Sequence, residues 1–94
     1  MTAAAPAPRR EAIDDHALAL PRLYHWERTS PTKRVFVQPL GGGAVREWTW
    51  GEALIDTRRM AAHLRSLDLP PGSRIALISK NCAHWLMCDW AIWM

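Results

Sequence analysis

The sequence predicts an α/β fold in the order helix, β-hairpin, helix, strand, helix. Three observations favour this order. Apolar residues recur at helical spacing between positions 53 and 67, two strand-like runs flank a glycine triplet, and an almost continuous apolar run follows a Pro-Pro-Gly turn. The chain has 94 residues, so it allows one domain at most.

The first expected element is a short helix that follows a disordered tail. Residues 1–17 are rich in Ala and Pro and then charged, which is typical of a segment without a packed core. Leu18–Arg28 carries an apolar stripe, and Pro21 suits a first helical turn. Pro31 ends the helix, because the residue before a proline is pushed out of the α region.

A β-hairpin is expected next. Val35-Phe36-Val37 is β-branched and aromatic, whereas Ala44–Trp48 alternates apolar and charged residues. Between them lies Gly41-Gly42-Gly43, for which a phosphate-binding loop is the alternative interpretation. A phosphate loop leads into a helix N-terminus, whereas these glycines lead into a strand pattern. The triplet is therefore interpreted as a hairpin turn.

The second helix begins at a capping box. In Thr49-Trp50-Gly51-Glu52 the Thr49 hydroxyl is expected to accept a bond from the Glu52 amide, and the Glu52 carboxylate to accept one from the Thr49 amide. The helix is expected to run to about Leu67. Residues spaced by three and four form its buried face: Ala53, Leu54, Thr57, Met60, Ala61, Leu64 and Leu67.

A turn, a strand and a last helix complete the expected fold. Leu69–Ser73 predicts the turn, and Arg74–Ser79 predicts a strand covered on both faces, as in a parallel sheet. Asn81 is the expected N-cap of a helix from Cys82 onward. This helix is nearly all apolar, and no Gly, Asn, Lys or Arg closes it before Met94. We therefore expect the opening piece of a larger protein, cut inside this helix.

Composition and charge narrow the classes of function. The net charge is +3 and the pI about 9.4, but the Lys and Arg residues are scattered, which favours a solvated surface over a nucleic-acid site. Cys82 and Cys88 are too few for a disulfide scaffold and fit a reducing compartment. The N-terminus lacks the order of a secretory signal, so a cytoplasmic location is expected.

A metal site is one candidate chemistry. Cys82, His84 and Cys88 are ligand types for soft metals, and His84 and Cys88 would share a helix face. A structural zinc site needs about four ligands, and the chain has no further cysteine. Buried small thiols and a histidine at the polar rim are the favoured interpretation.

The tryptophans, His16 and His25 are two further sets of candidate site residues. Tryptophans can stack on single-stranded nucleic acid, but no Lys or Arg lies between Trp85 and Trp93, so packing is favoured. His16 and His25 have no partner at catalytic spacing, and no G-x-S-x-G motif exists. The residues thus predict an α/β packing unit with no catalytic, cofactor-binding or metal-binding residue.

Four segments, taken in order, resemble AMP-forming acyl-CoA synthetases of the AMP-binding, adenylate-forming family. Trp48–Glu52 resembles the family's "T-Y-x-E-L" helix start, and Met60–Leu77 resembles "A-x-x-L-x-x-L-G-(V/L)-x-x-G-D-R-V-A-L". Ser79–Trp85 is similar to "x-x-N-x-x-E-W", and Asp89–Met94 to "D-L-A-I-L-x". The resemblance covers about residues 18–94 and is closest to the long-chain fatty-acyl branch.

The resemblance implies a ligase that makes an acyl-adenylate from a long-chain fatty acid and ATP with Mg²⁺, then transfers the acyl group to coenzyme A. The family's "S-G-T-T-G-x-P-K-G" loop, its "Y-G-x-T-E" segment, its "T-G-D" aspartate and its late catalytic lysine are not in this sequence. Residues 18–94 would then be an incomplete N-terminal subdomain, inactive alone. Its partner would be the rest of the same polypeptide, which would bind ATP, Mg²⁺, coenzyme A and fatty acid; a peripheral membrane contact of the full enzyme stays open.

The sequence departs from the family pattern at a few positions. Asp68 stands where the family has a helix-ending Gly, Ser73 replaces an Asp, and Cys88 and Trp90 replace smaller or aliphatic residues. A bulky Trp in a packed helix would cost about 1–3 kcal/mol by overpacking. The rival interpretation is a small non-catalytic interaction module that engages a partner through the Trp-rich last helix.

Overall fold

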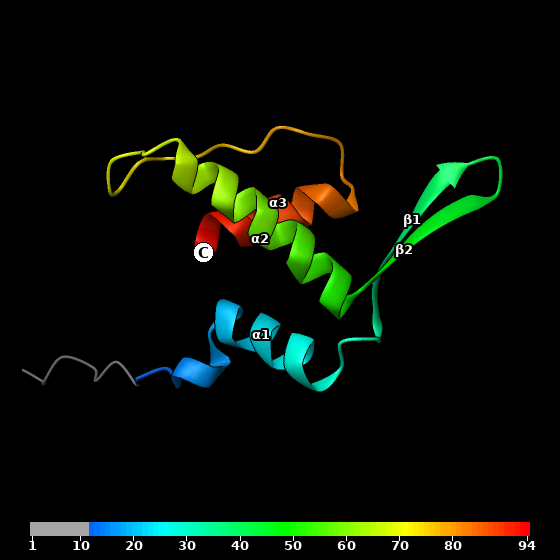
Figure 1. Cartoon of the computed structure of the whole chain (residues 1–94), viewed down its shortest axis with the longest axis horizontal. Helices are drawn as coiled ribbons and strands as arrows, with labels where there is room; N and C mark the ends of the chain where they lie inside the picture. Colours follow the sequence, from blue (N-terminus) through cyan, green and yellow to red (C-terminus); the bar gives the residue numbers. More distant parts are fainter. Residues whose placement is uncertain (1–11) are drawn as a thin grey trace, which may run out of the picture.

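The computed structural model describes residues 12–94, which form three α-helices, one 3-10 turn and a two-stranded sheet (Figure 1). This mixed architecture agrees with the predicted partial α/β unit. The elements are α1 (Ala19–Thr29), β1 (Arg34–Gly41), β2 (Ala44–Thr49), α2 (Trp50–Ser66) and α3 (Ala83–Trp93), preceded by the 3-10 turn η1 (Asp15–Ala17).

Helix α1 matches the predicted first helix to within a residue at each end. Pro21 lies in its first turn, and the helix closes with a 2.8 Å bond from the Ser30 amide to the Trp26 carbonyl, directly before a proline. The predicted disordered tail, 1–17, lies outside the described residues up to position 11. Its last three residues form the turn η1 instead of irregular chain.

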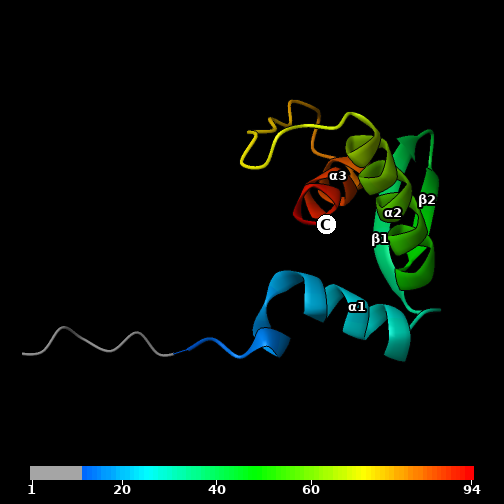
Figure 2. The ribbon, with the colours of Figure 1, turned by 60° about the vertical axis from the view of Figure 1, so that its left-hand side comes forward.

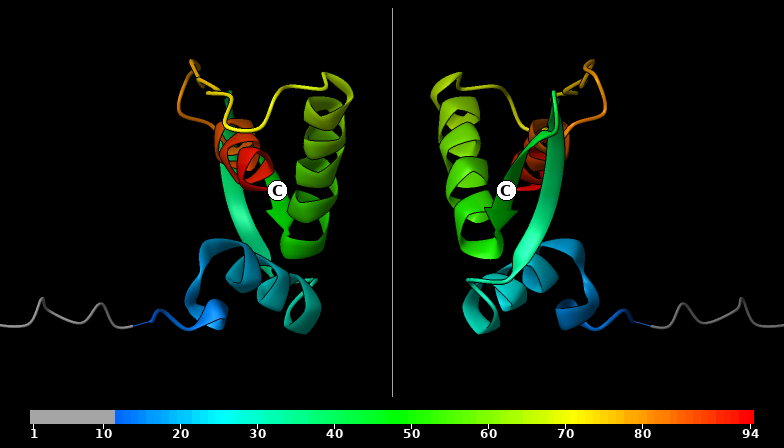
Figure 3. Two further views of the ribbon diagram at one scale, coloured as in Figure 1. Left: turned by 90° about the vertical axis from the view of Figure 1, so that its left-hand side faces the viewer. Right: turned by 90° about the vertical axis from the view of Figure 1, so that its right-hand side faces the viewer.

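The β-hairpin is confirmed, and it runs beside α2 and α3 (Figures 2 and 3). Strands β1 and β2 pair antiparallel, with Phe36 opposite Trp48 and Val37 opposite Glu47. Trp48 is only 2% exposed, since its side chain lies against the helices. On β1 the half-buried Phe36 and Gln38 alternate with the exposed Val37 and Pro39, whereas on β2 Trp48 is the one buried residue.

Helix α2 begins as predicted, with the Thr49 hydroxyl accepting a 3.2 Å bond from the Glu52 amide. The predicted return bond to the Glu52 carboxylate is not formed among residues 12–94. Thr49 is still part of β2 there, opposite Arg34. The capping-box motif therefore contributes one bond at this end of α2, the bond that the Thr49 hydroxyl accepts.

The predicted buried face of α2 is correct except at its end. Four of its members are fully buried, Ala53, Leu54, Thr57 and Ala61. Leu67 is exposed, because it caps the helix rather than continuing it. The face packs against α3, whose own buried positions, Ala83, Met87 and Ala91, are spaced by four. Small residues on both helices let the backbones approach closely.

The start of α3 differs from the prediction. Cys82, not Asn81, is the N-cap, and its side chain makes no capping bond. The amide of Ala83 donates instead to the side-chain oxygen of Gln38 on β1, at 3.0 Å. A partner 45 positions away in the sequence thus caps the helix, which local sequence patterns do not reveal.

The predicted strand Arg74–Ser79 is wrong: this segment is an extended loop above α2 and α3 in Figure 1. Ile78, expected in a sheet covered on both faces, is 95% exposed. A strand forms only where a neighbouring strand supplies hydrogen-bond partners. Among residues 12–94 the sheet contains only β1 and β2, and neither lies beside this segment.

Replacing Asp68 by glycine should stabilise the chain. Asp68 follows the end of α2 with φ +51°, and its amide donates to the Arg65 carbonyl at 3.1 Å. Glycine adopts this left-handed conformation without the steric cost of a Cβ, so Asp68→Gly should raise the free energy of unfolding by about 1 kcal/mol in urea titrations. The matched control Ala62→Gly, at an exposed position inside the helix, should lower it by about 1 kcal/mol. Equal or lower stability of Asp68→Gly would contradict this account.

Candidate functional site

The glycine triplet does not form an anion cradle. Gly41, Gly42 and Gly43 all have positive φ, at 90°, 61° and 83°, and they turn the chain from β1 into β2. No atom lies within 4 Å of the position that a Cβ would take at any of them. Since a phosphate cradle needs converging amides at a helix N-terminus, the hairpin-turn interpretation is confirmed.

The N-terminus of α2 is closed to ligands by the protein itself. The amides of its first three residues donate to the carbonyls of Lys33 (3.0 Å) and Pro31 (3.0 Å) and to the hydroxyl of Thr49 (3.2 Å). These donors are the ones that a helix N-terminus would offer to a phosphate. The loop before β1 therefore completes the helix cap. Only the Thr49 part of this cap has a local sequence signal.

The three candidate metal ligands are not brought together with a further ligand. The ring of His84 lies edge-on against Trp48, with ring centroids 5.4 Å apart. Cys82 and Cys88 are half-buried free thiols. No group of three or more His, Cys, Asp or Glu side chains converges within residues 12–94. His84 thus packs on the core rim.

His16 and His25, the two histidines flanking the predicted first helix, also lie apart. His16 belongs to the exposed turn η1, and His25 packs edge-on against its neighbour Trp26, with ring centroids 5.1 Å apart. His25 lies on α1, and its backbone carbonyl accepts the Thr29 hydroxyl at 2.8 Å. His16 and His25 do not lie together, and neither imidazole forms a pair with a nucleophilic side chain in residues 12–94.

Four aromatic rings from four different elements form a continuous stack, here named the aromatic column. Trp26 of α1 stacks on Trp50 of α2 at 6.4 Å, and Trp50 stacks on Trp90 of α3 at 6.0 Å with an interplanar angle of 9°. Trp90 stacks on Phe36 of β1 at 5.2 Å. Trp90 is thus accommodated by stacking, although it replaces an aliphatic residue of the family pattern. Trp93 does not join the column and is 48% exposed.

The polar side chains around Trp48 contact its indole ring or one another. The guanidinium of Arg46 lies over the Trp48 ring, 4.3 Å from its centroid, and the Trp48 indole nitrogen donates to the Asp56 carboxylate at 3.4 Å. Asp56 also lies 3.7 Å from the guanidinium of Arg59. A carboxylate beside an aromatic ring could bind a cation, but Arg46 already occupies that face.

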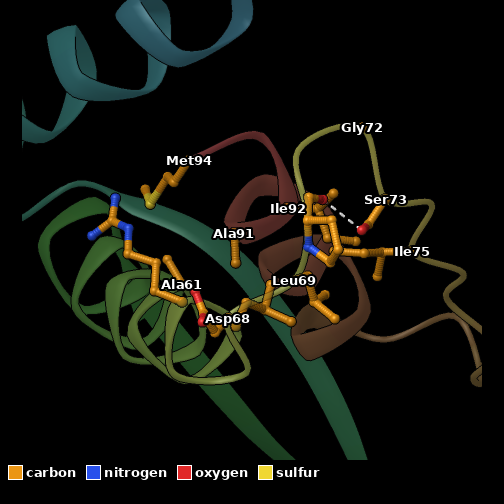
Figure 4. Close-up of a pocket in the computed structure, with 12 residues that line it drawn as sticks. Ala61, Asp68, Leu69, Gly72, Ser73, Ile75, Ala91, Ile92 and Met94 are labelled. Atoms are coloured by element: carbon orange, nitrogen blue, oxygen red, sulfur yellow. Dashed lines mark hydrogen bonds between the residues drawn. The ribbon is translucent and has the colours of Figure 1, made fainter.

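An open pocket of about 350 Å³ lies between the end of α2, the loop that follows it and the end of α3 (Figure 4). Aliphatic and polar groups share its wall, and Arg65, Asp68 and Ser73 supply the polar side chains. The Ser73 hydroxyl is occupied, because it donates to the Pro70 carbonyl at 2.6 Å. The lining residues are Ala61, Leu64, Arg65, Asp68, Leu69, Pro70, Gly72, Ser73, Ile75, Ala91, Ile92 and Met94. This wall offers packing surface and no acid–base or nucleophilic pair.

An ion pair fastens α1 to α2. Arg58 donates to both carboxylate oxygens of Glu27, with one distance of 2.6 Å, and its guanidinium lies 5.4 Å from the centroid of the Tyr24 ring. The hydrogen bond from Arg58 lowers the pKa of Glu27, and its positive charge adds to this, while partial burial opposes it. The same contact raises the pKa of Arg58.

Glu27→Gln should lower the free energy of unfolding at neutral pH and make that free energy less dependent on pH in the acid range. The pKa of Glu27 is lower when folded than its ordinary value of 4.5, so its stabilising contribution is complete above that value and is lost as pH falls through the folded pKa. Glu27→Gln should lower the free energy of unfolding at pH 7 by about 1 kcal/mol or less.

Urea titrations at pH 7 and between pH 5 and pH 3 measure both effects. Glu47→Gln is the matched control, because its pair with Arg34 (2.7 Å) is more exposed on both sides. The Glu27 variant should lose more at pH 7 than the Glu47 variant. The reverse order would refute a fastening role for the Glu27–Arg58 pair.

None of the helices in residues 12–94 has the length and apolar character to cross a membrane.

Comparison with known proteins identifies the family of the chain. Searches of curated proteins and of solved structures gave no match. A family model described as AMP-binding enzyme matches residues 23–94, a range that includes every ring of the aromatic column. The match spans most of the chain, and the protein therefore belongs to the AMP-binding, adenylate-forming enzyme family.

Proposed function

We propose that this chain is the N-terminal packing unit of an AMP-forming acyl-CoA ligase, and that it contributes scaffold rather than catalytic groups. The full enzyme would activate a long-chain fatty acid with ATP through an acyl-adenylate and transfer the acyl group to coenzyme A. Membership of the adenylate-forming family supports the ligase class. The motifs at Trp48–Glu52 and Met60–Leu77, which are closest to the long-chain branch, support the choice of substrate.

One observation carries the scaffold part of the proposal: the groups that could hold a nucleotide are engaged within the protein. The amides that begin α2 are bonded to Pro31, Lys33 and Thr49, and the amide that begins α3 is bonded to Gln38. Residues 12–94 hold no group of three metal-ligating side chains for Mg²⁺. We therefore assign no part of an ATP, Mg²⁺ or coenzyme A site to the described residues. These would be bound by the proposed partner, the remainder of the same polypeptide, in the cytoplasm.

The packing of the helices suits a scaffold. The aromatic column joins α1, α2, α3 and β1, and the ion pair between Glu27 and Arg58 adds a second contact between α1 and α2. Aromatic pairs contribute about 0.5–1.5 kcal/mol each beyond the area that they bury. These contacts hold the outer surfaces of α2 and α3 in a fixed relation, on which a larger domain could be built.

The chain alone should show no ATP–pyrophosphate exchange with any fatty acid, because the phosphate-binding loop and the catalytic lysine of the family pattern are not in this sequence. The measurement uses labelled pyrophosphate with carboxylic acids from acetate to palmitate. Exchange above the level of a no-protein blank would overturn the scaffold proposal. The ligase part has an independent test, which is to read the coding DNA beyond the Met94 codon in all frames. A "V-P-L-Y"-like strand followed by an "S-G-T-T-G" loop is expected, and their absence would remove its main support.

The second candidate function is a non-catalytic interaction module. The half-exposed Trp93 on the apolar helix α3 favours it, since exposed aromatic residues are common at partner surfaces. The two proposals differ in the behaviour of the isolated chain. A packing unit should be poorly soluble and melt over a broad range, whereas a module should be a monodisperse monomer with a sharp melt.

A further inference from the structure

The outer side of α1 carries a row of basic side chains, here named the basic face. Its members are Arg22, His25 and Arg28, which are spaced by three along the helix, and Lys33 from the loop that follows α1. The buried Leu23 and the pair between Glu27 and Arg58 lie on the side of α1 toward α2. Helices α2 and α3 lie to one side of α1 in all views (Figures 1, 2 and 3), so they leave the basic face uncovered.

Trp26 holds two of these cations at one ring. The Arg22 guanidinium lies 5.5 Å from the ring centroid, the Lys33 ammonium lies 5.9 Å from it, and the His25 ring packs edge-on at 5.1 Å. Arg22 and Lys33 are far apart in the sequence, so the fold brings them together. Like charges beside one ring repel each other, and an anion held between them would remove this repulsion.

The backbone that carries the basic face is already ordered. The Ser30 amide donates to the Trp26 carbonyl at 2.8 Å, and the Lys33 amide donates to the Ser30 carbonyl at 3.1 Å. The Lys33 carbonyl accepts the Trp50 amide at 3.0 Å, and the Trp26 ring stacks on Trp50 at 6.4 Å. A surface that is fixed before binding loses less conformational entropy when a partner binds.

The charge of the basic face is not compensated within residues 12–94. The ion pairs of these residues join Arg34 to Glu47, Arg58 to Glu27 and Arg59 to Asp56, and none of them includes a member of the basic face. Glu27, the acidic residue of α1, is engaged by Arg58 of α2. The exposed charges of Arg22, Arg28 and Lys33 therefore fit an acidic partner.

The charges beside the basic face favour a peptide over a uniformly anionic surface. The exposed Asp14 and Asp15 lie at the turn η1, which packs against α1. A membrane or a nucleic acid carries negative charge over its whole surface, so it would also meet these two carboxylates. A peptide places its acidic side chains at particular positions. Trp26, moreover, is half-buried in the aromatic column and is not free to insert into a bilayer.

We propose that the basic face binds an acidic peptide segment of a partner protein, whose carboxylates reach Arg22 and Lys33 beside Trp26. A guanidinium can hold a carboxylate by two parallel hydrogen bonds, and the ammonium of a lysine adds a compact positive charge. Arg28 extends the surface along α1 for a further acidic side chain. The proposal goes beyond the proposed function and holds whether or not the full enzyme is an acyl-CoA ligase.

The test is fluorescence anisotropy of a labelled peptide, Gly-Glu-Ser-Glu-Asp-Ser-Glu-Gly, titrated with the full chain at low ionic strength. The peptide should bind, and its affinity should fall as salt is added, because salt screens exposed charges. A matched peptide with Gln and Asn in place of Glu and Asp should bind about tenfold more weakly or not at all.

Variants of exposed side chains assign the binding to the basic face. Arg22→Gln and Lys33→Gln should each weaken binding of the acidic peptide by about twofold to fivefold. The matched control Arg74→Gln removes an exposed cation that lies outside both the basic face and the ion pairs of residues 12–94, and it should have no effect. The double variant Arg22→Glu/Lys33→Glu should lose the acidic peptide and bind its lysine counterpart, which also shows that the variant folds.

Other occupants give different results in the same assay. Vesicles rich in phosphatidylserine or an oligothymidylate that displace the peptide at a lower concentration of charge would assign the surface to lipid or nucleic acid and overturn the proposal. A dimer of the chain that Arg22→Gln abolishes would assign it to a second copy, with the same consequence. Equal binding of the Gln peptide, or an equal loss in Arg74→Gln, would show that the basic face does not select an acidic segment.

Discussion

The aromatic column is the interaction on which the rest of this structure depends. Trp26, Trp50, Trp90 and Phe36 come from four different elements, and each ring lies between 5.2 and 6.4 Å from the next. The column passes from α1 through α2 and α3 to β1. It therefore links the only sheet in the described residues to every helix, in a unit whose other buried side chains are mostly small.

Hydrogen bonds of polar groups at the helix ends help to hold this packing in place. The starts of α2 and α3 are completed by partners elsewhere in the chain, Pro31 with Lys33 for α2 and Gln38 for α3, whereas Leu18 before α1 makes no side-chain capping bond. Buried polar groups are costly unless they are hydrogen-bonded, and the buried Thr57 hydroxyl meets this condition within α2 by donating to the Ala53 carbonyl. A side chain or carbonyl that completes a helix end is not free to bind a substrate. Helix ends completed in this way support the proposal that residues 12–94 of this member of the adenylate-forming family serve as scaffold.

The loop of residues 73–82 leaves apolar side chains exposed. It passes beside the open pocket, and its isoleucines remain partly or almost fully exposed, with Ile78 at 95%. Burying apolar surface stabilises by about 25 cal/mol per Å², so covering this surface is a source of stability that the unit does not use by itself. Poor solubility of the isolated chain would follow from this exposed apolar surface.

Sequence alone determined the elements whose signals are local. The hairpin follows from Gly41–Gly43 between two alternating runs, the start of α2 from Thr49, and its buried face from helical spacing, because each depends on neighbouring residues. Tertiary structure decided what depends on distant partners. Gln38 sets the start of α3, the stacking geometry selects Trp90 rather than Trp93, and the apolar run at Arg74–Ser79 stays a loop because a strand exists only where another strand pairs with it.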